Sequence, residues 1–112
     1  MSVQNRELPV LPGLRFDLPT PDVDEAVAAA ALIGDRTRAG ILSILADGPH
    51  CVCEMAAALG ERQNNVSNHL ARLRDAGLVR ASRHRVDARW VYYERDEEAC
   101  RAAAHLLDGL LG

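Results

Sequence analysis

The 112-residue sequence contains no lysine, since all 13 of its basic residues are arginine, and only 4% of its residues are aromatic. Three cysteines are an odd number and too few for a disulfide framework, so we expect reduced thiols with a packing, metal or redox role. No stretch is long enough to cross a bilayer, and the first residues lack the basic-then-apolar pattern of an export signal. These absences predict a cytoplasmic protein.

The charge is small overall but unevenly distributed along the chain. The net charge is -3, yet residues 61–89 hold 7 arginines against 3 acidic residues, while the flanking segments are acidic. Surface fields act over roughly 8–10 Å, so a local basic stripe on an acidic body is enough for contact with phosphates. At this length we expect one domain with a modest core, for which a dimer that shares helices is a natural solution.

The sequence predicts an extended N-terminal arm over residues 1–21 and a folded domain over residues 22–112. The arm carries four of the five prolines, which remove hydrogen-bond donors where a helix would need them. Either it has no structured role or it packs across a dimer partner. In the domain, acidic residues after 21 begin a first helix, Asp35 caps a second, and Gly48-Pro49 ends it. We expect these two helices to form the scaffold and dimer interface.

Two short helices with a glycine between them follow, and this is the outline of a helix-turn-helix. The first spans 52–59, with Met55, Ala58 and Leu59 expected inward, and Gln63 begins the second. The second helix has one apolar stripe and a face of amides, which read adenine edges in the major groove. His69 falls beside the stripe, so we expect it to pack or to anchor the helix. The residues expected to contact DNA here are Gln63, Asn64, Ser67, Asn68 and Arg72.

After Gly77, residues 79–93 are expected to form a two-stranded hairpin, the wing, with further DNA contacts near its tip. The aromatic residues at 90, 92 and 93 are expected to pack this hairpin onto the helices, with base stacking as the less favoured alternative. A last helix begins with acidic residues and carries leucines near its end, which favour a two-fold partner. The tip residues expected to contact DNA are Arg83, His84 and Arg85.

Cys51 and Cys53 lie at the start of the helix expected over 52–59. Thiolates select soft acceptors such as As(III), Sb(III), Cd(II) and Pb(II), with Zn(II) the weaker candidate, and a helix start lowers a thiol pKa. Residues two apart on a regular helix point about 200° apart, so an ion that takes both is expected to distort the first turn. As(III) commonly takes three thiolates, which makes Cys100 the candidate third ligand; burial between helices is its alternative role. His50 could instead serve zinc.

Together these features resemble the ArsR/SmtB family of metal- and metalloid-responsive winged-helix repressors. The resemblance covers roughly residues 22–112 and rests on Asp35-Arg36-Thr37-Arg38, Cys51-Val52-Cys53-Glu54, Ser67-Asn68-His69-Leu70 and Gly77-Leu78-Val79. The CVC-acid sequence is similar to the thiol site of arsenite- and cadmium/lead-sensing members. The resemblance implies homodimers that occupy an operator and leave it when the ion binds.

The sequence also departs from the family's patterns. Ala56 stands where one type of arsenite sensor has a third cysteine, and residues 1–50 contain no cysteine for an N-terminal thiolate. Asp96 and His105 do not reproduce the spacing of the zinc ligands of the terminal helix, which disfavours that kind of sensing.

We therefore predict a mainly helical protein with a small β-hairpin, a homodimeric winged helix-turn-helix of order α-α-α-α-β-β-α. Its predicted function is repression of transcription from double-stranded operator DNA, with release when a soft ion binds cysteine thiolates. The main alternative is a thiol redox or persulfide sensor of the same fold that uses Cys100 with Cys51 or Cys53. An enzyme is disfavoured because no nucleophile, base and pocket set is evident, and a protein-interaction module is disfavoured by the arginine stripe.

Overall fold

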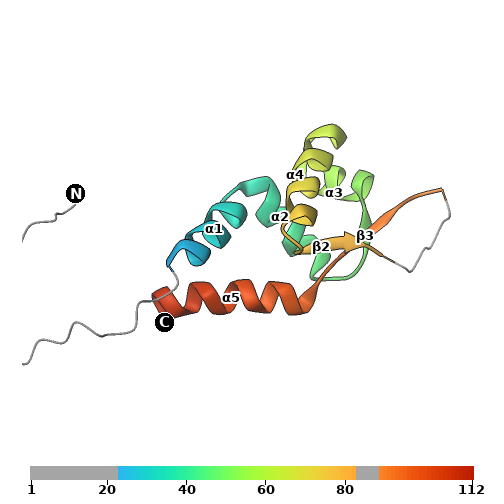
Figure 1. The fold of residues 1–112 in the computed structure, drawn as a ribbon. Helices are drawn as coiled ribbons and strands as arrows, with labels where there is room; N and C mark the ends of the chain where they lie inside the picture. The colour runs from blue at the N-terminus through green and yellow to red at the C-terminus, as the bar shows by residue number, and fades with distance from the viewer. Residues whose placement is uncertain (1–22, 83–88) are drawn as a thin grey trace, which may run out of the picture.

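The computed structural model describes residues 23–82 and 89–112, shown as a ribbon in Figure 1. The arm predicted for residues 1–21 lies outside these residues. In the part described, helices and short strands follow in an order that confirms the predicted winged helix-turn-helix and adds one strand to it. The elements are α1 (Val23–Ile33), α2 (Arg36–Leu45), β1 (His50–Cys51), α3 (Val52–Leu59), α4 (Gln63–Asp75), β2 (Val79–Ala81), β3 (Tyr92–Arg95) and α5 (Glu97–Leu111).

The helix ends lie at the residues whose chemistry predicts them. The Asp35 carboxylate accepts two backbone N–H groups of the first turn of α2, at 2.9 and 3.0 Å. Gly60, with φ 66°, ends α3 in the left-handed conformation, and Gly77, with φ 82°, follows α4. The Asp96 carboxylate accepts the backbone N–H of Ala99 at 3.0 Å and so caps α5. These local signals therefore fix where α2 and α5 begin and where α3 and α4 end.

The core lies between α2, α3 and α4. Its largest fully buried side chains are Ile41, Met55, Val66 and Leu73, which come from all three helices. In α3, Ala56 is buried and Ala58 is exposed, so the prediction that Ala58 faces inward is wrong. The inward positions of α3 are 52, 55, 56 and 59, a spacing of three and four residues that places 58 on the opposite side. This core holds α4 against the scaffold along one face only.

The sheet is larger than predicted because β1 joins the hairpin. Its three strands lie in the order β1-β3-β2, and both pairings are antiparallel. His50 pairs with Tyr93 and Cys51 pairs with Tyr92. The second strand of the predicted hairpin, β3, ends at Arg95, two residues beyond the predicted end at residue 93. The backbone of Cys51 is therefore attached directly to the strand that continues into the wing.

Helices α1 and α5 pack side by side at the end of the molecule away from the wing, as Figure 1 shows. Ala26 of α1 is fully buried. Several large apolar side chains of the same two helices remain exposed in the single chain: Val23, Val27, Leu110 and Leu111. Among the described residues, no helix is both long and apolar enough to span a bilayer.

The turn between α3 and α4 depends on the positive φ of Gly60, and this can be tested by two substitutions. A Cβ at this position would meet no atom within 4 Å, so any cost of Gly60→Ala comes from the backbone. We expect Gly60→Ala to lower the free energy of unfolding by about 1–2 kcal/mol, measured by urea denaturation. Gly60→Asn is the matched control and should cost clearly less, since asparagine tolerates this conformation. Equal costs for the two variants would contradict this explanation.

Candidate metal centre and nucleic-acid interface

Cys51 and Cys53 bring their sulfurs together at the start of α3. The Sγ atoms lie 2.9 Å apart. The expectation that the two side chains point about 200° apart is wrong, because Cys51 is not part of the helix. It ends β1 and precedes α3 with extended backbone angles, φ −93° and ψ 167°. The two sulfurs therefore face each other without distortion of the first helical turn.

The spacing of this thiol pair, Cys51 and Cys53, determines what an ion must do to occupy it. Metal–thiolate bonds of about 2.3 Å in tetrahedral geometry separate two sulfurs by about 3.8 Å. The two sulfurs lie 2.9 Å apart, so they would have to move apart by roughly 1 Å for both to bind one such ion. A chelated ion therefore pushes the two side chains apart rather than drawing them together.

Burial raises the pKa of the Cys51 thiol, and the hydrogen bond with Cys53 raises it further. Cys51 is only 4% exposed, whereas Cys53 is half-buried. The backbone N–H of Cys51 donates to the Glu54 carboxylate at 2.9 Å, so this carboxylate closes the turn beneath the pair. The expectation that the helix start lowers the pKa of Cys51 is wrong, because burial and the hydrogen bond with Cys53 raise this pKa more than the hydrogen bond with the Glu54 backbone lowers it.

Cys100 lies on α5, where its thiol points to the carbonyl oxygen of Leu78 at 3.8 Å. Burial raises the pKa of this thiol as well. The described part of the chain contains no cluster of three or more His, Cys, Asp or Glu side chains able to hold a metal. His50 contacts the carbonyl oxygen of Gly48 through Nδ1, at 2.8 Å. One chain thus brings together Cys51 and Cys53 only, and a third ligand from Cys100 stays a prediction.

The amide face predicted on α4 is exposed to solvent along the whole helix. Val66, Leu70 and Leu73 form the buried stripe on the other side, as predicted. Asn65 is the exception among the amides, because its side chain donates to the Glu61 carboxylate at 2.6 Å. The exposed polar residues are Gln63, Asn64, Ser67, Asn68 and Arg72. Arg83, His84 and Arg85, predicted at the wing tip, lie outside the described residues.

Arg74 joins the end of α4 to the wing, a contact that the sequence did not indicate. Its guanidinium lies 5.4 Å from the centre of the Tyr93 ring, within the range of a cation–π interaction. This confirms that Tyr93 packs the hairpin onto the helices. The pairing of Tyr93 with Arg74 could not be predicted from local spacing, because the two residues belong to different elements. This contact therefore links α4 directly to β3.

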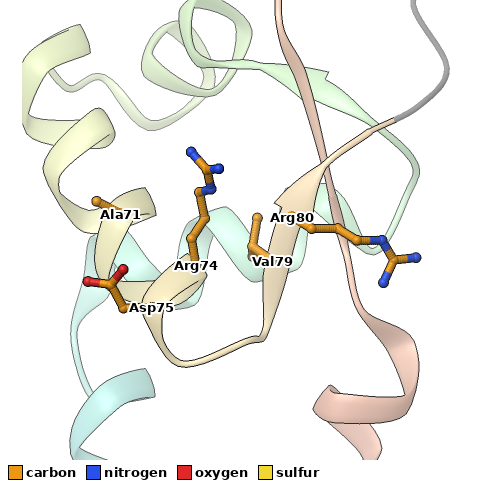
Figure 2. Close-up of a pocket in the computed structure, with 5 residues that line it drawn as sticks. All are labelled: Ala71, Arg74, Asp75, Val79 and Arg80. Carbon is orange, nitrogen blue, oxygen red and sulfur yellow. The ribbon is translucent and has the colours of Figure 1, made fainter.

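A hollow of about 450 Å³ lies between α4 and β2 and is drawn in Figure 2. The side chains of Arg74 and Arg80 point apart in this view. Arg80 pairs with Glu94 at 3.0 Å and Asp96 at 3.1 Å, so its charge is directed to the base of the wing. The hollow therefore lies where α4 meets the wing, and the polar side chains that line it do not point toward a common centre. Its lining residues are Ala71, Arg74, Asp75, Val79 and Arg80.

Comparison with known proteins gives a consistent picture. Residues 35–81 match the family model described as "Bacterial regulatory protein, arsR family". The arsenical resistance operon repressor of Escherichia coli K12 is 36% identical over 78 residues, which are 69% of this chain and 64% of that protein. An HTH-type transcriptional regulator of Methanocaldococcus jannaschii, MJ1325, is 33% identical over 88 residues, 78% of this chain and 96% of that protein.

Solved structures are also similar to this chain. The homodimeric winged helix-turn-helix DNA-binding domain of Mb0332 from Mycobacterium bovis matches with a TM-score of 0.60 and 28% identity, covering 75% of this chain and 76% of that one. The chain spans less than two thirds of the length of several curated relatives that it matches, between 56% and 64% for three arsenical-resistance regulators.

The protonation of Cys51 gives a pH-dependent prediction. In the Cys53→Ser/Cys100→Ser variant Cys51 is the sole thiol, and its ionisation can be followed by ultraviolet thiolate absorbance. We expect ionisation at higher pH in the folded variant than in the same chain in urea, since burial favours the neutral thiol. A raised folded pKa also means that the stability contributed by this group is lost as pH rises through it. Coincident titrations in the folded and unfolded chains would contradict this account.

Proposed function

Since this chain belongs to the arsR family of bacterial regulatory proteins, we propose that it represses transcription and that soft ions relieve the repression. It binds double-stranded operator DNA as a homodimer, and it leaves the operator when a thiophilic ion binds Cys51 and Cys53. The observation that carries the proposal is the pair of sulfurs 2.9 Å apart at the head of the helix that packs on α4.

The inducing ion is a soft acceptor. Two adjacent thiols suit As(III), Sb(III), Cd(II) and Pb(II), and Zn(II) is the weaker candidate because the nearby imidazole of His50 does not join the pair. The name of the E. coli relative, an arsenical resistance operon repressor, favours As(III) among these. A trivalent ion has a place for a third thiolate, which Cys100 of either subunit could supply.

The DNA-contacting surface is the exposed face of α4 together with the wing. The amides and the hydroxyl of this face suit base edges and phosphates, and the arginines around it supply the charge for the backbone. Homodimerisation covers the exposed apolar side chains of α1 and α5 and presents two such faces at once. The homodimeric state named for the M. bovis neighbour supports this arrangement.

Coupling between the thiol pair and DNA follows two routes from Cys51. The pair heads α3, which packs directly on α4. The backbone of Cys51 also pairs with Tyr92, next to the Tyr93 ring that holds Arg74 of α4. Parting the sulfurs therefore disturbs the contacts that orient α4 and the wing relative to each other. A coupling free energy of roughly 1–3 kcal/mol would weaken operator binding by about 5–150-fold.

A second candidate function is a dithiol redox or persulfide switch on the same fold. The short distance between Cys51 and Cys53 favours it, because two thiols in contact can be oxidised together by a peroxide or a persulfide donor. This alternative keeps the DNA-binding surface and changes only the signal.

The proposal can be tested by fluorescence anisotropy on the DNA upstream of the protein's own coding sequence. Adding As(III), Sb(III), Cd(II) or Pb(II) to the complex should release the DNA, with affinity falling about 5–150-fold. The Cys51→Ser/Cys53→Ser variant should bind as tightly as the wild type and should not be released by any of these ions. Cys100→Ser tests separately whether Cys100 supplies the third thiolate.

The outcomes separate the possible assignments. Release of the double variant by As(III) or Cd(II) would contradict the thiol-pair site, and unchanged behaviour of Cys100→Ser would exclude a third thiolate from that residue. Release by peroxide alone, with no response to ions, would favour the redox alternative.

The Asn68→Ala variant should bind operator DNA more weakly than the wild type by about 1–3 kcal/mol if the Asn68 amide reads a base.

A further inference from the structure

Arg38 carries a buried charge that contacts two other helices. The residue is 7% exposed, and its guanidinium donates to the carbonyl oxygens of Leu32, through Nε, and of Ala31, at 3.3 Å. These carbonyls belong to the last turn of α1, where the helix dipole favours a cation. A third nitrogen lies 2.9 Å from Nδ1 of His69, which is on α4. One side chain of α2 therefore joins the end of α1 to the middle of α4.

A hydrogen bond between the two groups requires an acceptor on His69. A guanidinium can only donate hydrogen bonds, so Nδ1 of His69 must act as the acceptor at 2.9 Å. The imidazole is then neutral, with its proton on the other ring nitrogen. An imidazolium carries protons on both nitrogens and has no acceptor to offer. Protonation of His69 would thus remove the hydrogen bond and set two positive charges against each other.

The other charged groups near His69 do not replace this contact. Asp35 of α2 has a carboxylate oxygen 3.7 Å from Nδ1. That carboxylate already accepts two backbone N–H groups, and the hydrogen bond from the backbone of Arg38 is the main reason that its pKa is lowered. The Glu61 carboxylate, at the turn before α4, is bound to Thr37 and Asn65. Arg72, one turn along α4 from His69, is exposed.

We propose that Arg38 and His69 are positioning residues for the DNA-contacting face of α4, and that this face is held in place only while His69 is neutral. The inference rests on the proposed DNA-binding function. His69 directly follows Asn68 and lies two residues from Ser67, so a change in its anchoring shifts the polar groups that face the DNA. Acidification therefore weakens operator binding through His69, independently of any ion at the thiol pair.

Two variants of His69 separate anchoring from simple packing. In His69→Asn the amide oxygen takes a position close to that of Nδ1, accepts from Arg38 and cannot be protonated in this range. In His69→Leu the volume is largely kept and the acceptor is lost. Operator affinity is measured by fluorescence anisotropy at about pH 8 and about pH 5.5, the range in which histidine titrates, at constant ionic strength and without ions. Circular dichroism at both pH values establishes that each variant is folded.

We expect wild-type affinity to fall about tenfold between the two pH values, the effect of losing one hydrogen bond to a charged group. His69→Asn should bind as the wild type does at high pH and should not weaken on acidification. His69→Leu should bind about tenfold more weakly at high pH. The difference between wild type and His69→Asn isolates His69 from the other histidines.

The same pH dependence in wild type and His69→Asn would overturn the proposal, as would wild-type affinity in His69→Leu. If the wild type binds operator DNA at neither of the two pH values, the proposed function is wrong. The Arg38–His69 contact is then tested by ¹⁵N NMR of the imidazole. An unprotonated Nδ1 at high pH supports the contact, and a protonated Nδ1 there excludes it.

Discussion

The shared core of α2, α3 and α4 is the constraint on which the rest of this structure depends. Ile41, Met55, Val66 and Leu73 are fully buried within it, so α4 has no freedom to turn without breaking contacts with both neighbouring helices. The polar face of α4 points outward because its apolar stripe is held inward. Any group that moves α2 or α3 therefore acts on α4. Arg38 belongs to α2, and the thiol pair lies at the start of α3.

Much of the fold could be read from local chemistry in the sequence. Asp35, Gly60 and Gly77 mark helix ends through a cap and two left-handed residues, and these signals need no knowledge of distant parts of the chain. The stripe of α4 and its exposed amides follow from helical periodicity alone. The strand β1 could not be found in this way, because a two-residue strand has no periodicity and exists only through its pairing with β3.

The errors at the thiol site have the same origin. Helical geometry does not hold for Cys51, because β1 keeps this residue in an extended conformation just before the helix, and the sulfurs meet at 2.9 Å. The pKa of Cys51 depends on burial against the sheet, which the sequence does not reveal. The free-energy cost of ion binding therefore lies in removing a thiol proton and separating the two sulfurs. It does not lie in straining the first turn of the helix. The contact of Arg74 with Tyr93 was missed because it joins residues far apart in the sequence.

We propose that occupancy of the thiol pair and occupancy of the operator oppose each other. Linkage requires the effect to be reciprocal, so DNA must weaken ion binding by the same factor by which the ion weakens DNA binding. The most direct test is a titration of Cd(II), followed by thiolate-to-metal absorbance, into free protein and into protein saturated with operator DNA. We expect the affinity for Cd(II) to be about 5–150-fold lower on DNA, equal to the loss of operator affinity caused by Cd(II). Equal Cd(II) affinities in the two states would contradict it.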